Sequence, residues 1–402
     1  MTGHGRAAVA AWWAPGRVNL IGDHTDYNEG LVLPFAIDRG TRVSATPRAG
    51  DVVRVSSAQR PGRAVEARVD VVPGARTHTW ADYVLGCVWA LRSSGVEVAG
   101  AQLLVDGDLA LGAGLSSSAS LTCATTLALL DLAGVSRSSI EVAQLARQAE
   151  VEFVGAPVGL MDQIVSMSAT PGHATFLDVR DLTVEQVRFD PAAAGRRLMI
   201  IDSRVRHRVP EGAYAARVAA CHEAATALGV GSLRDVVDVV EVDALTDPVL
   251  RARARHVVTE NERVSRTVEL LVAQRLDELG PVLLASHASL RDDFEVSTPE
   301  LDVAVEAAVS AGADGARLTG AGFGGSVITL VPQDCWSAVA SAVAAAYAAR
   351  DWQVPDVWPA QAAGGARRVS AQHFGDDLSN PLSPDRRMGE GSPAYPSPGG
   401  LP

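Results

Sequence analysis

The alternation of hydrophobic and polar positions predicts strands followed by helices in the first part of the chain. Residues 31–72 are rich in Val, Thr and alternating polar residues, which is typical of short strands joined by turns. The turn-forming residues of this stretch are Pro47, Gly50, Pro61 and Gly62. Apolar spacing and Ala/Leu content predict helices near residues 80–92, 117–132 and 138–153, with a strand at 101–106.

The second part of the chain alternates between strand-like runs and longer helical stretches. Strands are predicted near residues 174–177 and 197–202, and a glycine turn separates two further strand-like runs within residues 316–330. Helices are predicted near residues 213–228, 247–274, 298–311 and 336–349. The combined pattern is that of an α+β protein.

Length and local composition predict how the chain divides into domains. A chain of 402 residues is long enough for two packed domains, and we place the boundary near residue 190. Residues 1–190 would form an N-terminal domain and residues 191–369 a C-terminal domain. Residues 370–402 are rich in Pro, Gly, Ser and Asp, with too little apolar content to offset the entropy of ordering, so we expect a disordered tail.

Charge and composition exclude several classes of partner and mechanism. A formal net charge of -12 and a pI near 5.2 argue against binding to nucleic acid or to an anionic membrane. No apolar run approaches the ~20 residues that a membrane-spanning helix needs. All 35 basic residues are arginine, which excludes mechanisms that require a phosphate-binding or Schiff-base lysine, including P-loop and protein-kinase chemistry.

Cysteine usage and the N-terminal residues indicate a cellular compartment. The cysteines lie far apart with no CxxC spacing, at Cys87, Cys123, Cys221 and Cys335. Neither a disulfide framework nor a zinc site is therefore predicted. The apolar stretch at residues 7–14 is short for a signal peptide and runs directly into a polar motif. We expect a cytoplasmic protein that acts as a monomer.

The first candidate for chemistry is the segment LGAGLSSSAS at residues 111–120, between a predicted strand and a predicted helix. Gly112 and Gly114 would let the backbone approach a ligand closely, and the free N–H groups at the start of the helix would attract a phosphate. Ser116, Ser117 and Ser118 add hydroxyl groups for phosphate or magnesium. A helix N-cap that follows a flexible turn is an equally ordinary interpretation of this segment.

The second candidate is the segment APGRVNLIGDHTDYNEG at residues 14–30, where charged and polar side chains crowd a short stretch between glycines. Such a density of polar groups suits a ligand with several hydroxyls, each of which needs an oriented partner. A solvated loop without a ligand is the alternative.

The third candidate is RLTGAGFGGSVITLV at residues 317–331, where small residues between two strand-like runs form a tight turn. The turn could pass close to a bound nucleotide or could be a structural hairpin. Beside these motifs, the segment GLMDQ places Asp162 shortly after Gly159, and Glu150 precedes it near the end of a predicted helix. An acidic residue at a helix start is often only a cap or a partner of the helix dipole.

In combination, these segments resemble the galactokinases of the GHMP kinase family. APGRVNLIGDHTDYN is similar to the galactokinase signature, LGAGLSSSAS to the phosphate loop and LTGAGFGGS to the third motif of the family. Four further segments agree in kind and order: WADYVLG, GLMDQ, RVRHRVPEGAYAARVAACHEA and SHASLRDDFEVSTPELD. The resemblance covers residues 14–369. It implies a two-domain α+β GHMP kinase fold with the active site between the domains.

The resemblance also implies an activity, its cofactors and the residues that carry it. The activity is transfer of a phosphoryl group from ATP, with Mg²⁺, to the anomeric C1 hydroxyl of galactose. Asp162 matches the catalytic base, and Arg17 matches the neighbour that stabilises developing negative charge. Positions that match sugar ligands are Asp23, His24, Thr25, Asp26, Gly159 and Tyr214. Positions that match the ATP site are Ser57, Gly112, Ala113, Gly114, Leu115, Ser116, Ser117 and Ser118, with Ser118 and Glu150 as magnesium ligands.

One departure from the family and two other functions bear on this assignment. Galactokinases usually have Glu in the string GEHTDY, where this chain has Asp23, so the contact to the C6 hydroxyl is expected to change. A sugar 1-kinase for L-arabinose or N-acetylgalactosamine would share the same frame. A non-catalytic sugar sensor would tolerate loss of the catalytic and magnesium-binding residues, which are all intact here.

Overall fold

The computed structural model describes residues 9–109, 112–156, 158–205 and 212–370. The N-terminal half is built on a six-stranded sheet in the order β13-β1-β3-β6-β4-β5. All neighbours in this sheet are antiparallel except β4 and β6, which run parallel. The strands are β1 (Ala10–Asn19), β3 (Pro34–Pro47), β4 (Val52–Ser57), β5 (Val65–Arg68), β6 (Ala101–Gly107) and β13 (Arg367–Arg368).

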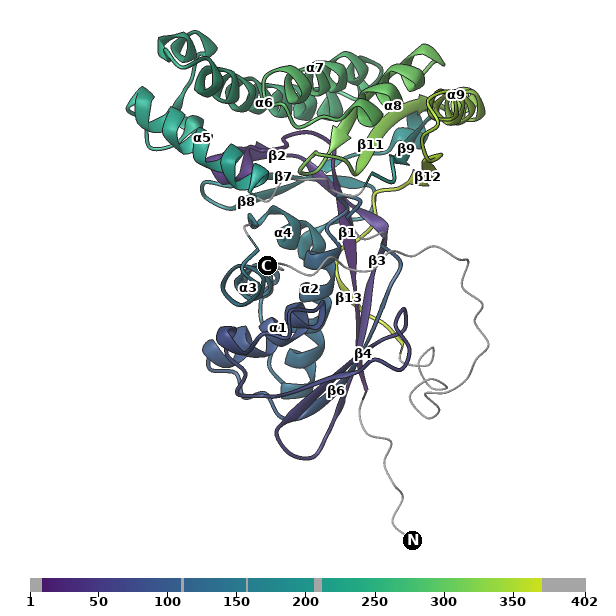
Figure 1. Cartoon of the computed structure of the whole chain (residues 1–402). Helices are drawn as coiled ribbons and strands as arrows, with labels where there is room; N and C mark the ends of the chain where they lie inside the picture. Colours follow the sequence, from purple (N-terminus) through teal and green to yellow (C-terminus); the bar gives the residue numbers. More distant parts are fainter. Residues whose placement is uncertain (1–8, 110–111, 157, 206–211, 371–402) are drawn as a thin grey trace.

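Helices cover one side of this sheet (Figure 1). They are α1 (Ala81–Ser93), α2 (Ser117–Ala133), α3 (Ser139–Gln148) and α4 (Met161–Ser168). Helix α2 packs directly on β1 and β3. Helix α3 begins where the sequence provides a capping box: the Ser138 side chain accepts a hydrogen bond from the N–H of Glu141, and the Glu141 carboxylate accepts one from the N–H of Ser138. The interior between sheet and helices is almost wholly aliphatic.

A small three-stranded sheet lies between the two halves (Figure 1). Its order is β2-β7-β8, with β2 (Leu31–Val32), β7 (His173–Asp178) and β8 (Thr183–Arg188). Helix α6 of the C-terminal half packs against β2 and β8. The sheet therefore gives the two halves a shared packing surface.

The C-terminal half is built on a four-stranded antiparallel sheet in the order β10-β11-β9-β12. Its strands are β9 (Arg196–Asp202), β10 (Gly315–Thr319), β11 (Ser326–Pro332) and β12 (Asp356–Ala360). Every residue of β10 is buried. The accompanying helices are α5 (Ala213–Leu228), α6 (Pro248–Val272), α7 (Leu279–Asp292), α8 (Pro299–Ser310) and α9 (Trp336–Ala348).

The predicted elements agree closely with these bounds where the helices are long and capped. Helix α5 has the predicted limits, and α6 and α8 begin at a Pro that follows an Asp or Thr cap. The helix predicted at 138–153 is divided, because α3 ends at Gln148 and a π-helical turn follows at Ala149–Val154. Strands β1, β8, β12 and β13 and helices α4 and α7 were not predicted. The predicted tail at residues 371–402 lies outside the described residues.

The last described segment returns to the N-terminal half. Strand β13 pairs with Trp12 and Trp13 of β1. The N–H of Ala363 donates to the carbonyl of Ala36 at 2.8 Å, and the N–H of Ala366 donates to the carbonyl of Ser166 at 2.8 Å. Part of the sequence range 191–369 therefore packs on the first sheet, and the boundaries at residues 190 and 369 remain predictions.

A buried cation joins β10 of the C-terminal half to the end of β1. Arg317 is 0% exposed. Its Nη1 donates to the carbonyls of Asn19 at 3.1 Å and Leu20 at 3.0 Å, and its Nη2 donates to the carboxylate of Asp23. Asp23 also accepts from Asn19 Nδ2 at 2.9 Å and from the N–H of Gly320 at 3.2 Å. Burial raises the pKa of Asp23, and Arg317 opposes that rise.

A second buried carboxylate supports the same segment from α6. Glu260 accepts from the N–H of Gly22 at 3.0 Å and from Ser286 Oγ at 2.7 Å, and it pairs with Arg263. Burial acts to raise the pKa of Glu260, but Arg263, His256 and Arg317 together lower it to about 2. Glu260 is therefore a fixed negative charge, and it lies 3.9 Å from the Arg317 guanidinium.

We predict that Asp23→Asn lowers the free energy of unfolding by about 3 kcal/mol, because a nearly isosteric amide leaves the buried Arg317 short of a charge partner. This loss is at the lower end of the usual range for breaking a buried ion pair, because the negative charge of Glu260 remains near Arg317. Denaturant unfolding followed by circular dichroism measures it, with Glu66→Gln in the exposed ion pairs to Arg48 and Arg54 as the control. Equal midpoints for the two variants would show that the Asp23 pair is not stabilising.

Candidate active site

The site is centred on an ion pair between Arg17 of β1 and Asp162 in the first turn of α4. Arg17 Nε donates to Asp162 Oδ1 at 2.8 Å, and Arg17 Nη2 donates to Oδ2 at 3.0 Å. This bidentate geometry fixes both the position and the plane of the carboxylate. Arg17 is buried, whereas the Asp162 side chain is 22% exposed. The carboxylate is therefore held from one side and accessible from the other.

The loop before α2 packs against this pair. Its backbone bends at Gly112, Gly114 and Ser116, which all have positive φ. Arg17 Nη1 donates to the Gly114 carbonyl at 2.6 Å, and the Arg17 N–H donates to the Leu115 carbonyl at 3.2 Å. The Ser116 hydroxyl donates to Asp162 Oδ2. The free N–H groups at the start of α2 thus lie beside the ion pair and form a potential anion site.

The glycine-rich turn of the third motif contacts the same loop from the C-terminal half. Ser326, the first residue of β11, donates through its hydroxyl to the Ala113 carbonyl at 2.8 Å. A Cβ atom on Gly325 would lie 3.2 Å from that carbonyl oxygen. The two motifs, about two hundred residues apart in sequence, therefore meet in space.

A buried carboxylate lies next to the start of α2. Glu150, in the π-helical turn, accepts from Thr122 Oγ1 at 2.9 Å and from Gln163 Nε2 at 2.8 Å, both through Oε1. Its Oε2 is buried and has no hydrogen-bond partner among the described residues. Burial raises the pKa of Glu150 to about 7, and the hydrogen bonds from Gln163 and Thr122 oppose that rise. An unpartnered buried carboxylate oxygen is what a hard cation would require.

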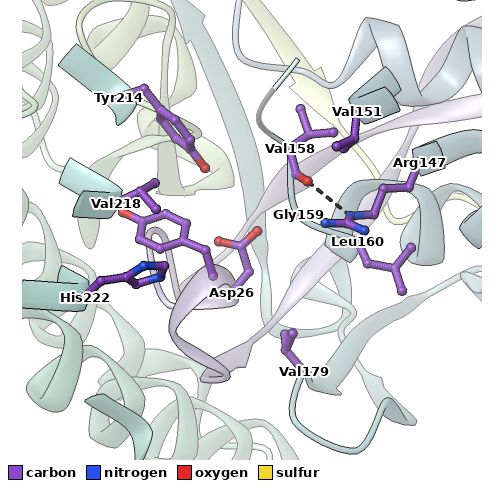
Figure 2. Close-up of a pocket in the computed structure, with 11 residues that line it drawn as sticks. Asp26, Arg147, Val151, Val158, Gly159, Leu160, Val179, Tyr214, Val218 and His222 are labelled. Carbon is purple, nitrogen blue, oxygen red and sulfur yellow. Dashed lines mark hydrogen bonds between the residues drawn. The ribbon is translucent and has the colours of Figure 1, made fainter. Parts of the chain in front are cut away.

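A cavity of about 450 Å³ opens beside Asp26. Figure 2 shows Tyr214, Val218 and His222 of α5 on one side of it, facing Val151, Val158 and Leu160 on the other, with Asp26 between them. Its lining residues are Asp26, Tyr27, Arg147, Val151, Val158, Gly159, Leu160, Val179, Tyr214, Val218 and His222. The cavity thus has apolar walls and a few polar groups, as small-molecule sites usually do.

Asp26 and Gly159 are in close contact within this cavity. A Cβ atom added to Gly159 would lie 2.0 Å from Asp26 Oδ2, so glycine is required for the observed approach. Burial, followed by the negative charge of Asp162, raises the pKa of Asp26 to about 6. The positive charge of Arg17 acts in the opposite direction and lowers the pKa of Asp26.

The residues before Asp26 are buried and hold this segment in place. Thr25 Oγ1 donates to the carbonyls of Gly22 and Leu31 at 2.8 and 2.7 Å. His24 Nδ1 lies 2.9 Å from the Tyr27 hydroxyl, and its ring packs on Phe294 with 4.6 Å between centroids. Burial lowers the pKa of His24 to about 3, so the imidazole is neutral. Unlike Asp26, Gly159 and Tyr214, the residues Asp23, His24 and Thr25 do not line the cavity of Figure 2.

The structure therefore gathers most of the predicted site residues, and it adds some that the sequence did not indicate. Ser57 lies at the end of β4, where its hydroxyl donates to Gln59 Oε1 at 3.1 Å. Tyr27 lay within the polar motif but carried no separate signal. Thr122 and Gln163, which donate to Glu150, could have been found from their positions in the sequence. Thr122 stands one helical turn after Ser118, and Gln163 directly follows Asp162. No feature of the sequence indicated that Arg147 and the valines line the cavity.

Within the described part of the chain, none of the helices combines the length and the apolarity that crossing a membrane would demand.

Family models match three regions of the chain. They are the galactokinase galactose-binding signature at residues 3–47, the GHMP kinases N terminal domain at residues 82–170 and the GHMP kinases C terminal model at residues 267–349. The matches follow the order of the three sequence motifs and fall in the two halves of the fold.

Similar proteins agree with these matches. A galactokinase of Streptomyces coelicolor is 45% identical over 372 residues, which cover 91% of this chain and 96% of the relative. A galactokinase of Mycobacterium bovis is 44% identical over 360 residues, which cover 89% of this chain and 99% of the relative. The crystal structure of Lactococcus lactis galactokinase complexed with galactose has a TM-score of 0.85 at 34% identity. The match covers 90% of this chain and 95% of that chain.

A more distant match shows the fold alone. Methanococcus jannaschii mevalonate kinase has a TM-score of 0.66 at 16% identity and covers 90% of this chain and 100% of that chain. The predicted α+β GHMP kinase fold is thus confirmed. With the galactokinase signature, the two GHMP models and relatives above 40% identity over most of its length, the chain belongs to the galactokinase family of GHMP kinases.

Proposed function

We propose that this chain transfers the γ-phosphoryl group of ATP to the anomeric C1 hydroxyl of galactose, giving galactose 1-phosphate and ADP. The observation that carries the proposal is the bidentate Arg17–Asp162 pair, which contacts the loop before α2. In this proposal the pair supplies a proton acceptor beside a phosphate-binding loop, which is what phosphoryl transfer to an alcohol requires. The galactose complex of the Lactococcus lactis enzyme supports the choice of sugar.

Asp162 acts as the base and Arg17 as its partner in this proposal. The exposed side of the Asp162 carboxylate accepts the C1 hydroxyl proton, while Arg17 favours the negative charge that develops on the sugar oxygen. The transition state of phosphoryl transfer is loose, so most of the acceleration comes from holding the hydroxyl and the γ-phosphate in line. The rigid pair and the adjoining loop supply that alignment.

The sugar would occupy the region around Asp26, Gly159 and Tyr214. Asp26 offers carboxylate oxygens to sugar hydroxyls, and the Tyr214 ring faces it across the cavity (Figure 2). The geometry supports a different role for Asp23 from the one expected by resemblance. Its carboxylate is bonded to Arg317, Asn19 and Gly320, so we assign it to holding the sugar-binding segment. His24 and Thr25 act with it in the same way.

ATP would bind at residues 112–118, with its phosphates at the start of α2 and with Ser57 as a further contact. Glu150 and Ser118 would hold Mg²⁺, which offsets charge on the phosphates when bound. The unpartnered Glu150 Oε2 fits such an ion. The described residues contain no group of three or more His, Cys, Asp or Glu side chains suited to a metal, so phosphate oxygens and water would complete the coordination.

We also propose that the enzyme works in the cytoplasm. Cys87, Cys123 and Cys221 are buried free thiols, which is typical of proteins kept in a reducing compartment. The expectation of a monomer remains a prediction.

We predict that Asp162→Asn keeps the fold and ATP binding but lowers kcat by about 10²-fold or more, because an amide cannot accept the proton. A coupled ADP-release assay measures the loss. The assay is run with galactose, L-arabinose, N-acetylgalactosamine and glucose, and galactose should give the highest kcat/KM. Near-normal turnover in a folded variant would refute the assignment of the base.

We predict that the affinity for galactose falls as the pH drops through about 6, the pKa of Asp26. Below this pH the carboxyl group carries a proton, and above it the carboxylate accepts hydrogen bonds from sugar hydroxyls more strongly. Isothermal titration calorimetry between pH 5 and 7.5 measures the affinity. Asp26→Asn should bind weakly with a flat profile.

The same titration has an internal check. Because the charge of Asp162 contributes to the raised pKa of Asp26, Asp162→Asn should move the midpoint of the affinity profile to lower pH. A midpoint that stays in place would mean that another group controls the pH dependence.

We predict that Gly159→Ala raises KM for galactose by about 10-fold or more, because the new methyl group must displace the Asp26 carboxylate. KM for ATP should change little, because the residues that line the cavity with Gly159 and Asp26 include none from the described loop before α2. Gly74→Ala is the matched control, because no heavy atom of the described residues beyond its chain neighbours lies within 4 Å of its added Cβ. Equal KM values for galactose in the two variants would show that Asp26 does not bind the sugar.

A further inference from the structure

The residue that introduces α2 has an unusual conformation and an unusual bond. Ser116 is the N-cap of α2, yet its backbone is left-handed, with φ 56° and ψ 46°. N-cap serines normally have extended backbone and accept a hydrogen bond from the first turn. Here the side chain caps no N–H group of the described first turn, and its hydroxyl instead donates to Asp162 Oδ2. A left-handed serine beside a proposed base calls for a functional explanation.

We infer that Ser116 is a positioning residue for the catalytic base Asp162, linking the geometry of the phosphate-binding loop to the geometry of proton transfer. The inference rests on the proposed function, in which Asp162 is the base. It gives Ser116 a role that differs from that of Ser117 and Ser118, which adjoin it in the same loop.

The contacts around Ser116 form a closed ring. Asp162 Oδ1 accepts from Arg17 Nε at 2.8 Å, and Oδ2 accepts from Arg17 Nη2 at 3.0 Å and from Ser116. Arg17 in turn donates to the carbonyls of Gly114 and Leu115. Loop, arginine and carboxylate therefore cannot move independently. Ser116 supplies the one side-chain hydrogen bond of this ring that runs directly from the loop to the carboxylate.

The left-handed backbone of Ser116 is held by the same surroundings. Its carbonyl accepts the N–H of Ser120 at 3.1 Å, and the Ser120 hydroxyl donates to the Ala14 carbonyl at 2.7 Å. The start of α2 is thus tied to β1, three residues before Arg17. A hydroxyl aimed at Asp162 is a consequence of this arrangement, because an extended N-cap would direct the side chain toward its own helix.

The role has consequences for the proposed reaction. In-line transfer requires the phosphate and the base to keep a fixed relation, and small displacements of either lower the rate strongly. Ser116 holds one oxygen of Asp162 from the phosphate side, while Arg17 holds both oxygens from the β1 side. The Ser116 hydroxyl gives up no proton in this scheme, because it acts only as a hydrogen-bond donor.

A double-mutant cycle with Asp162→Asn tests the inference. Ser116→Ala should lower kcat by about 10-fold or more, since it removes a hydrogen bond to a charged group, with a smaller change in KM for galactose. In the Asp162→Asn background the same substitution should change kcat less than about twofold, because the carboxylate base is already absent. Ser117→Ala is the matched control, and it should change kcat by the same factor in both backgrounds.

Ser116→Gly separates the hydroxyl from the backbone. Glycine adopts the left-handed conformation freely, so this variant removes the hydroxyl together with its Cβ without the strain that alanine would place on the backbone of the loop. Its kcat should fall as far as that of Ser116→Ala. If Ser116→Gly retains the parent kcat, or if Ser116→Ala changes only KM for ATP, Ser116 does not position the base.

The outcomes distinguish this inference from the proposed function. Near-normal turnover of Asp162→Asn overturns the base assignment and, with it, the role of Ser116. A large loss in Asp162→Asn, combined with an equal effect of Ser116→Ala in both backgrounds, overturns the inference alone. Thermal melting curves recorded for every variant show whether a loss of activity reflects unfolding.

Discussion

A guanidinium group buried between the two halves is the constraint on which the rest of the structure depends. Removing a charge from water is costly unless hydrogen bonds and an opposite charge replace the solvent. For Arg317 the replacements are the carbonyls of Asn19 and Leu20 and the carboxylate of Asp23. These partners form one end of β1 and the segment after it. The same strand carries Arg17, so the contact that satisfies the buried charge of Arg317 also sets the position of the Arg17–Asp162 pair relative to the C-terminal half.

The site brings several carboxyl groups together in buried positions, where burial disfavours their negatively charged form. Burial raises the pKa of Asp26 and of Glu150, and the charge of Asp162 raises both further. Such an arrangement is unfavourable in the free protein and becomes favourable when cations and hydroxyl groups are present. Arg17 is the cation that the chain itself supplies to Asp162. The sugar hydroxyls and the Mg²⁺ of the proposed function would relieve this unfavourable charge.

Much of this organisation could be predicted from the sequence, because dense motifs and capped helices carry local signals. A Pro after a cap marks the start of α6 and of α8, and the motifs predicted as sugar and phosphate sites contain the segments that meet around Arg17 and Asp162. Helix α7 was missed because Gly280 and Pro281 in its first turn weaken the helical pattern. The partner of Asp23 could not be predicted, since Arg317 lies 294 residues away and only tertiary folding brings them together. The left-handed backbone of Ser116 likewise arises from its neighbours.

Strand β13 has a consequence for the order in which the protein can be completed during synthesis. It covers the edge of β1, where the Arg367 guanidinium lies 4.0 Å from the centre of the Trp13 ring and Arg368 pairs with Asp131 at 3.1 Å. An uncovered strand edge invites pairing with other chains. Because β1 is synthesised long before β13, the edge at Trp12 and Trp13 stays open until residues 367 and 368 have been made. The sheet of the N-terminal half is therefore completed only after the strands and helices of the C-terminal half have been synthesised.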